Sequence, residues 1–285
     1  TLYIKREDLL HAEVSGNKFR KLKYSLLKAS ELKKDYLLTF GGAHSNHIAA
    51  TAAAGKLESI STIGFIRGDE LEFLKEKWSP TLKYADSCGM KLTFISREAY
   101  RDKDSEAFLN QLESQFPDAM IIPEGGTSEL AIKGCEEILS ETDGEYHYIC
   151  TSVGTGGTMA GLVNASLSHQ NILGFSALKS EHLSEEIKRI TTNTNWSINT
   201  DYHFGGYAKT SVELIQFMND FFRKTGIKLD PVYTGKLLFG IFDLAQKDYF
   251  PKGSKILAIH TGGLQGIEGM NERLRKKAQP QIITE

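Results

Sequence analysis

Cysteine is scarce in this sequence, and neither a long apolar run nor a signal peptide occurs in its 285 residues. The three cysteines, Cys88, Cys135 and Cys150, are widely spaced and form no CxxC pair. This pattern argues against a disulfide framework or a zinc site, and it favours a reducing compartment such as the cytoplasm. No apolar run could cross a bilayer, so we expect no membrane partner. Because the sequence starts at Thr1 rather than Met, the lack of a signal peptide within it says nothing about residues upstream.

An excess of one charge sign is also missing. The formal net charge is −2, with 34 Lys and Arg against 36 Asp and Glu, and no basic block occurs. Nothing therefore favours nucleic acid or an anionic membrane as a partner. Internal repeats, low-complexity segments and proline-rich linkers are absent as well. What is present is an ordinary globular composition, 40% apolar and 25% charged, with enough residues for one large or two coupled domains.

Short apolar runs alternate with amphipathic segments along nearly the whole chain. The run YLLTF at 36–40 is typical of a strand covered on both faces, and the apolar residues of 17–33 have helical spacing. We predict strands at the start of the chain and at 36–40, 60–66, 91–95, 119–122, 146–152, 171–176 and 255–260. We predict helices at 17–33, from about 45, and at 70–87, 104–115, 128–140, from about 158, 181–193, 209–225 and 236–248. This order predicts an α/β protein with parallel sheets and right-handed crossovers.

Glycines cluster where a predicted strand ends and a helix begins, and ligands of open α/β sheets bind at such joints. The segment Gly154-Thr155-Gly156-Gly157-Thr158 is one of them. Its glycines let an anion approach closely, and the following helix supplies free N–H groups. It is not a P-loop, because Gly-Lys-Ser/Thr is absent, and Met159 stands where a dinucleotide fingerprint needs its third glycine. We favour a phosphate site here, and the alternative is a tight turn without a ligand.

A second joint is the segment GGAHSNH at 41–47. Ser45 or Asn46 could simply cap the following helix. The functional interpretation is that exposed N–H groups bind a second anion, such as a substrate carboxylate. His44 and His47 lie three residues apart, but no acidic or cysteine partner is near, so we expect no metal site.

Two further joints complete the set. Lys18 follows Ser15-Gly16-Asn17 at the start of the first long helix, where its basic neighbours make it one surface lysine among several. Thr261-Gly262-Gly263 follows the last predicted strand and is either a turn or another ligand-facing joint. Together the four joints offer a lysine, a phosphate cradle and a carboxylate site, which are the parts that pyridoxal phosphate (PLP) chemistry requires.

The motifs SGNKFRKLKY, FGGAHSNH, PEGGTSELAIKG, SVGTGGTMAGL, DPVYTGK and HTGGLQG occur in this order, from Lys5 to Gly266. As an ordered set they resemble the family of D-cysteine desulfhydrase and 1-aminocyclopropane-1-carboxylate deaminase, which are tryptophan-synthase-β-like PLP enzymes of fold type II. The resemblance implies two α/β domains, each with a mostly parallel sheet flanked by helices. The small domain would span 28–123, and the large one would combine 1–27 with 124–285. PLP would lie between them, and the usual assembly is a homodimer.

The resemblance also implies specific cofactor contacts. Lys18 matches the lysine that forms a Schiff base with PLP, and Asn46 matches the asparagine that hydrogen-bonds the 3-hydroxyl group. Residues Thr155–Thr158 match the phosphate loop. Thr234 matches the position facing the pyridine nitrogen, and Thr261 lies near the same ring edge.

For substrate and catalysis, Ser45 matches a serine that faces the substrate, either as a carboxylate binder or in proton transfer. With Asn46 and His47 it forms the expected substrate site. Tyr233 in PVYTGK matches an active-site tyrosine, and Tyr207 in GGYAK matches a second one through a less distinctive flanking sequence.

Two threonines favour one branch of this resemblance. In the deaminase branch the position of Thr234 is typically Glu and that of Thr261 typically Leu. A carboxylate favours a protonated pyridine ring and a strong electron sink, as opening a cyclopropane requires, whereas a neutral hydroxyl favours a weaker sink. We therefore expect β-elimination of thiolate from D-cysteine, with Lys18 as the base and Tyr233 or Tyr207 as proton donor. The products would be pyruvate, ammonia and sulfide.

Other readings stay open from the sequence. Within the family these are deamination of 1-aminocyclopropane-1-carboxylate and β-elimination from another D-amino acid, such as a chlorinated or acetylated serine. A PLP-binding protein with little catalysis, serving cofactor handling or regulation, would bind PLP without turnover. A nucleotide-binding oxidoreductase would use the 154–158 loop for pyrophosphate, and Met159 disfavours it.

Overall fold

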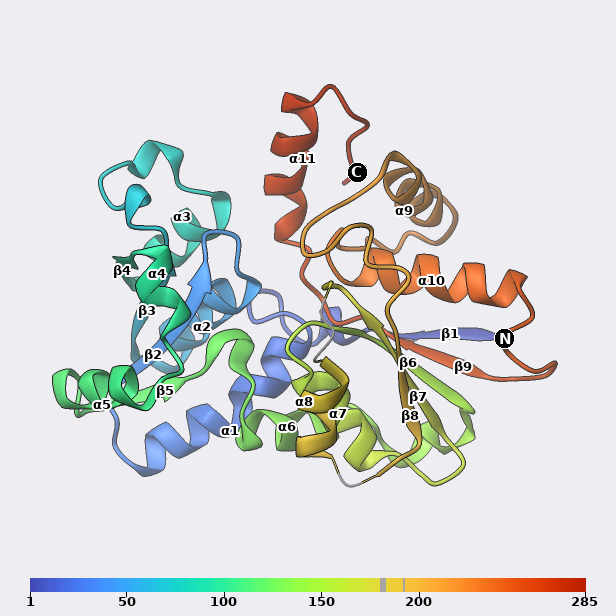
Figure 1. The fold of residues 1–285 in the computed structure, drawn as a ribbon, viewed down its shortest axis with the longest axis horizontal. Coiled ribbons are helices and arrows are strands. Elements are labelled where there is room, and N and C mark those ends of the chain that lie inside the picture. Colours follow the sequence, from blue (N-terminus) through green and yellow to red (C-terminus); the bar gives the residue numbers. More distant parts are fainter. Residues whose placement is uncertain (180–182, 192) are drawn as a thin grey trace.

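Two parallel sheets are formed within residues 1–179, 183–191 and 193–285, which the computed structural model describes (Figure 1). The larger sheet has five strands in the order β1-β9-β6-β7-β8. Their bounds are β1 Leu2–Lys5, β9 Ile256–Ile259, β6 Tyr148–Val153, β7 Asn171–Ser176 and β8 Trp196–Asn199. The smaller sheet has the order β4-β3-β2-β5, with β4 Lys91–Ile95, β3 Ser61–Arg67, β2 Tyr36–Gly42 and β5 Ala119–Ile122.

Helices cover both faces of the larger sheet. Successive residues of β6 point to opposite faces, so Cys150 packs in one apolar cluster and Ile149 in another. On the first face lie α9 (Val212–Thr225), α10 (Thr234–Gln246) and α11 (Gly266–Lys276). On the second lie α6 (Glu129–Glu136), α7 (Gly157–Ala165) and α8 (Leu183–Ile190). Figure 1 shows α9 and α10 above this sheet and α7 and α8 below it.

The smaller sheet is covered in the same way. The central strand β2 is buried over Leu37–Gly41, because helices shield both of its faces. One side carries α1 (Asn17–Glu31), α2 (Asn46–Glu58) and α3 (Pro80–Ser87), and the other carries α4 (Arg97–Arg101) and α5 (Glu106–Gln115). In the part of the chain that the structure describes, every helix is too short or too polar to span a membrane.

The first long helix, α1, belongs to both halves of the molecule. It packs on α6 beside the larger sheet and on α2 beside the smaller one. A domain boundary between residues 27 and 28 falls inside this helix. We therefore keep the division into 28–123 and 1–27 with 124–285 as a proposal.

The α/β architecture is confirmed, and the differences are local. In place of one helix over 70–87, two short 3₁₀ turns at Asp69–Leu71 and Lys75–Lys77 precede α3, which Ser79 caps and Pro80 begins. Proline fits the first turn of a helix but cannot continue one from upstream. The strand β8 and the helices α4 and α11 were not predicted. Of the helix expected at 181–193, residues 181, 182 and 192 lie outside the described residues.

Candidate active site

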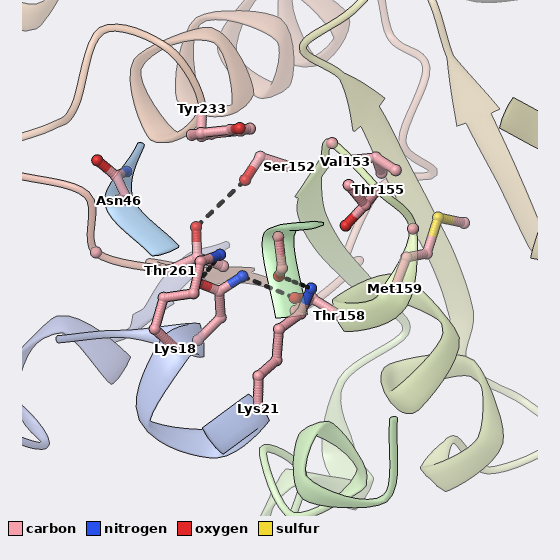
Figure 2. A pocket seen from close by; sticks show the side chains of 15 residues that line it. Lys18, Lys21, Asn46, Ser152, Val153, Thr155, Thr158, Met159, Tyr233 and Thr261 are labelled. Carbon is pink, nitrogen blue, oxygen red and sulfur yellow. Dashed lines mark hydrogen bonds between the residues drawn. The ribbon is translucent and has the colours of Figure 1, made fainter. Parts of the chain in front are cut away.

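A pocket lies where strands of both sheets end, and Figure 2 shows the side chains that line it. The smaller sheet contributes Asn46, which follows β2, and Gly125, which follows β5. The larger sheet contributes the segment after β6 and Thr261 after β9. The start of α1 forms the floor in Figure 2. This is the edge at which open α/β sheets bind ligands.

The loop from Gly154 to Thr158 forms an anion cradle on one wall of this pocket. Gly156 has φ +81° and caps α7, whose first turn leaves backbone N–H groups without intrahelical partners. A Cβ on Gly157 would lie 2.9 Å from Thr127 Oγ1 and 3.2 Å from Lys21 Nζ, so the loop approaches its neighbours too closely for a side chain there. The helix start and the free N–H groups favour a phosphate.

Two threonines tie this cradle to other segments. The hydroxyl of Thr158 accepts a hydrogen bond from Asn17 Nδ2 at 2.8 Å, which joins α7 to the start of α1. The hydroxyl of Thr155 lies 2.6 Å from that of Thr127, in the loop after β5. The cradle is therefore tied to the start of α1 and to the segment that follows β5.

Lys21 stands behind the cradle, and sequence reasoning missed it. Its side chain is buried, with the residue only 3% exposed, and its amine donates to the carbonyl of Gly125 at 3.0 Å and to the hydroxyl of Thr127 at 3.1 Å. Burial lowers the pKa of this amine. A buried cation next to free helix N–H groups adds the charge that a phosphate dianion needs.

Lys18 lies one turn before Lys21 on α1 and lines the same pocket. Its Nζ is 3.3 Å from Asn17 Oδ1. Removal from water lowers the pKa of the Lys18 amine to about 7, and the nearby cation of Lys21 acts in the same direction. A large fraction of the amine is therefore neutral at neutral pH, and the neutral form is the one that attacks a carbonyl.

The start of α2 brings only one of its three candidate residues to the pocket wall. Asn46 lines the pocket (Figure 2), whereas Ser45 and His47 are not among the lining residues. The Ser45 hydroxyl accepts a hydrogen bond from the N–H of Ile48 at 3.3 Å and so caps the helix.

His47 is buried behind this wall. Thr39 donates its hydroxyl proton to the carbonyl of Ile122 at 2.9 Å, so His47 Nε2 donates to Thr39 at 2.8 Å. The ring is then protonated on Nε2, and Nδ1 has no partner among the described residues. Burial, with the cations of Lys18 and Lys21, lowers the pKa of His47 well below its usual value. His47 is therefore a neutral imidazole.

Of the two candidate tyrosines, Tyr233 lines the pocket and Tyr207 does not. Tyr233 lies against the cradle, because a Cβ on Gly154 would be only 3.2 Å from its ring (Figure 2). The ring of Tyr207 meets it edge to face, with centroids 6.3 Å apart, and is 48% exposed. Burial raises the pKa of Tyr233 well above its usual value, and the neighbouring Tyr207 and Asp230 add to this shift. Burial also raises the pKa of Tyr207. Both hydroxyls are therefore protonated at neutral pH.

Thr234 and Thr261, on which the choice between desulfhydrase and deaminase depends, differ in whether they line the pocket. Thr261 lines the pocket, and its hydroxyl lies 3.3 Å from that of Ser152. Thr234 is fully buried and does not line the pocket. Its hydroxyl donates to the carboxylate of Asp230 at 2.9 Å and accepts from the N–H of Asp230 at 2.8 Å. A hydroxyl committed in this way has little freedom to turn toward a ligand.

The residues fit PLP at both of its ends. The cradle and Lys21 match a phosphate, and the Lys18 amine in the same pocket matches an aldehyde. Among the described residues, no Asp or Glu lines the pocket. Sequence reasoning also missed Ser152 and Asp230, since a serine inside a strand and an aspartate before a proline give no local signal of burial.

Known proteins are similar to this chain in both sequence and fold. A family model described as pyridoxal-phosphate dependent enzyme matches residues 1–262. A protein of Pyrococcus horikoshii named putative 1-aminocyclopropane-1-carboxylate deaminase is 32% identical, over 96% of this chain and 87% of that protein. A protein of Arabidopsis thaliana named bifunctional D-cysteine desulfhydrase/1-aminocyclopropane-1-carboxylate deaminase, mitochondrial, is 31% identical, over 93% of this chain and 73% of that protein.

Solved structures agree. The crystal structure of an ACC deaminase homologue has a TM-score of 0.81 at 29% identity, over 96% of this chain and 88% of that one. The structure of threonine deaminase isoform 2 from Solanum lycopersicum has a TM-score of 0.65 at 18% identity, over 95% and 78% of the two chains, and it shows a shared fold alone.

Proposed function

Because this chain belongs to the pyridoxal-phosphate-dependent enzymes, in the family of 1-aminocyclopropane-1-carboxylate deaminase and D-cysteine desulfhydrase, we propose that it is a D-cysteine desulfhydrase. The reaction is β-elimination, which converts D-cysteine and water to pyruvate, ammonia and sulfide. The observation that carries this choice is the absence of a carboxylate from the pocket lining of the described residues. Threonines occupy positions 234 and 261, and neither hydroxyl stabilises a cationic ring as a carboxylate does.

Residues of both halves of the molecule would hold the cofactor. The 154–158 loop and Lys21 would bind its phosphate, Lys18 would bind it covalently, and Asn46 would face its 3-hydroxyl group. Thr261 would lie near the ring nitrogen, with Thr234 behind it. When bound, PLP withdraws electrons from the substrate Cα and so acidifies the Cα proton.

The chain's own groups supply the proton transfers. The neutral Lys18 amine would take the Cα proton of the substrate, since its pKa of about 7 leaves free base at neutral pH. A protonated tyrosine, Tyr233 or Tyr207, would donate a proton to the departing sulfur. The N–H groups at the start of α2, with Ser45, Asn46 and His47 close by, would bind the substrate carboxylate. Ser45 caps α2 and His47 is buried, so we propose that they hold the start of α2 in place and do not contact the substrate directly.

The test is a substrate screen with purified, PLP-loaded protein. Sulfide and pyruvate should form together from D-cysteine, with little 2-oxobutyrate from 1-aminocyclopropane-1-carboxylate, and L-cysteine serves as the stereochemical control. Equal turnover of D-cysteine by wild type and Lys18→Ala would refute the proposed role of Lys18.

Deamination of 1-aminocyclopropane-1-carboxylate is the second candidate, since relatives at 31–32% identity carry that activity in their names. Formation of 2-oxobutyrate without sulfide would select it. Other D-amino acids with a leaving group on Cβ belong in the same screen. A PLP-loaded protein without any turnover would instead support a role in cofactor handling.

A homodimer in the cytoplasm completes the proposal. Its support is the usual assembly of the family and three cysteines that form no disulfide. Light scattering of the holoenzyme at several concentrations measures the assembly directly, and a monomer at all concentrations would contradict it.

A further inference from the structure

Lys236 is a buried lysine for which the proposed reaction has no use. It is the third residue of α10 and is only 2% exposed. The start of a helix carries a partial positive charge, which disfavours a cation in the first turn. Burying a charge without partners is costly as well. Something else in the structure must therefore stabilise this ammonium group.

Three backbone carbonyls do so. Lys236 Nζ donates to the carbonyl oxygens of His203 at 2.8 Å, Gly206 at 2.9 Å and Ala177 at 3.4 Å. An ammonium has three N–H donors, and each has an acceptor here. Burial lowers the pKa of Lys236 to about 8, and the charge of Asp230 opposes this shift. The charged form therefore predominates at neutral pH.

Two of these carbonyls close two consecutive turns. The N–H of Gly206 donates to His203 O at 3.0 Å, and the N–H of Lys209 donates to Gly206 O at 3.1 Å. Tyr207 and Ala208 are the two central residues of the second turn. Lys236 thus contacts the closing carbonyl of each turn, while Arg273 Nη1 of α11 donates to Ala208 O at 3.0 Å from another side.

The backbone of these turns needs such support. Phe204 and Ala208 both have φ +53°, a left-handed conformation that residues with a Cβ rarely adopt. Strained backbone of this kind persists only where its surroundings hold it, and it is concentrated at functional sites. The residue that these turns present is Tyr207, whose ring contacts Tyr233 at the pocket.

We propose that Lys236 is a positioning residue, whose ammonium group holds the turns at 203–209 so that Tyr207 stays against Tyr233. The consequence for turnover rests on the proposed function, while the ordering of the turns does not. A cluster of carbonyl oxygens like the one around the Lys236 ammonium group can also bind a free NH₄⁺ or K⁺ ion. Removing the lysine side chain therefore leaves a cage that a free ammonium ion fits.

The first experiment measures turnover of D-cysteine by the holoenzyme. Lys236→Met keeps the length of the side chain and removes the donors, and Lys209→Met is the matched control, an exposed lysine of the same segment. Loss of a general acid lowers the rate on the order of 100-fold, so we expect turnover to fall at least tenfold in Lys236→Met and to change little in the control.

A double variant tests whether Lys236 acts through Tyr207. If it does, Lys236→Met/Tyr207→Phe is no slower than the slower single variant. If the double variant is slower by the product of the two single effects, Lys236 acts independently of Tyr207 and the proposal is overturned.

Chemical rescue separates positioning from general damage. Ammonium chloride should restore activity to Lys236→Ala more than sodium chloride at equal ionic strength, and it should leave Lys209→Met unchanged. Equal effects of the two salts on Lys236→Ala would contradict the cage.

Hydrogen exchange tests the ordering without any turnover. In the wild-type holoenzyme the amides of Gly206 and Lys209 should exchange more slowly than that of Ser254. The Ser254 amide closes a similar turn onto Pro251 O at 3.0 Å, and among the described residues no lysine side chain donates to that carbonyl. Lys236→Met should lose this protection. Exchange of the three amides at equal rates in the wild type overturns the proposal even if Lys236→Met does not fold. A wild type without D-cysteine turnover but with protected turns refutes the proposed function alone.

Discussion

The hydroxyl of Thr234 donates a hydrogen bond to the carboxylate of Asp230 at 2.9 Å, and both groups are buried. The same carboxylate accepts from the backbone N–H groups of Val232, Tyr233 and Thr234. Asp230 therefore fixes the start of α10 and the orientation of the tyrosine and threonine that follow it. Position 234 acts through this network and does not itself line the pocket.

Thr234→Val tests how much the network contributes to stability. Valine has the shape of threonine but no hydroxyl, so the buried Asp230 loses one donor to its carboxylate and the acceptor of its backbone N–H. We expect the free energy of unfolding to fall by about 1–3 kcal/mol. Urea denaturation of the apoprotein measures this change, with Thr200→Val, an exposed threonine, as the control. Equal midpoints for the two variants would show that the hydrogen bond contributes nothing net.

Lys18→Ala should abolish covalent attachment of PLP while leaving the fold intact. The Lys18 amine lines the pocket and, with a pKa of about 7, is about half neutral at pH 7, so it can bind an aldehyde covalently. Borohydride reduction followed by mass spectrometry detects the attached cofactor independently of activity. Lys23→Ala is the control, since Lys23 is partly exposed and pairs with Glu137 at 2.6 Å. We expect PLP to be found on Lys18 in the wild type and on no lysine in Lys18→Ala. PLP found on Lys21 in the wild type would move the proposed attachment site to Lys21.

The rate of PLP attachment to the apoprotein should rise with pH and level off above about 7. The pKa of Lys18 is lowered to about 7, so the neutral nucleophile increases up to that pH and is nearly complete above it. At pH 6 the rate should be about one tenth of the plateau, because each pH unit below the pKa reduces the neutral fraction tenfold. Stopped-flow absorbance measures the rate, and a free lysine derivative corrects for titration of PLP itself. A rate that still rises tenfold per unit at pH 9 would contradict a depressed pKa.

Lys21→Met should weaken PLP binding without unfolding the protein. The variant removes a buried cation next to the phosphate cradle, and the loss of one charge-assisted phosphate contact costs about 1.5–3 kcal/mol, or roughly ten- to 100-fold in affinity. The apoprotein should keep its melting temperature within a few degrees, because a buried ammonium is costly in the absence of an anion. Fluorescence titration with PLP gives the affinity, and inorganic phosphate as competitor shows whether the phosphate end is affected. Unchanged competition by phosphate would place Lys21 outside the phosphate site.

The fold was largely predictable because the buried strands are short apolar runs and several of them end at polar, glycine-rich joints. The failures have physical reasons. The edge strand β8 has only four residues and none of them is fully buried, so it gives little hydrophobic pattern to detect. The helix α11 buries only Ile267, Met270 and Leu274, whose spacing of three and four is a helical signal that the basic residues around it obscured.

The sequence indicated the candidate site residues that lie in recognisable motifs. It did not indicate residues whose role depends on being buried in the folded chain. Lys21 looks like its basic neighbours in sequence, and its role depends on contacts with Gly125 and Thr127, more than 100 residues away. Such long-range packing leaves no mark on the local sequence. Thr234 and Asp230 are only four residues apart, but the local sequence does not indicate that both side chains are buried.

The position of α1 has a mechanical consequence. This helix packs on both halves of the molecule and carries Lys18 near its first turn. If the smaller sheet swings relative to the larger one, the motion must pivot about this shared helix. Lys18 would then move little relative to either sheet, whereas Asn46, at the start of α2, would move with the smaller sheet.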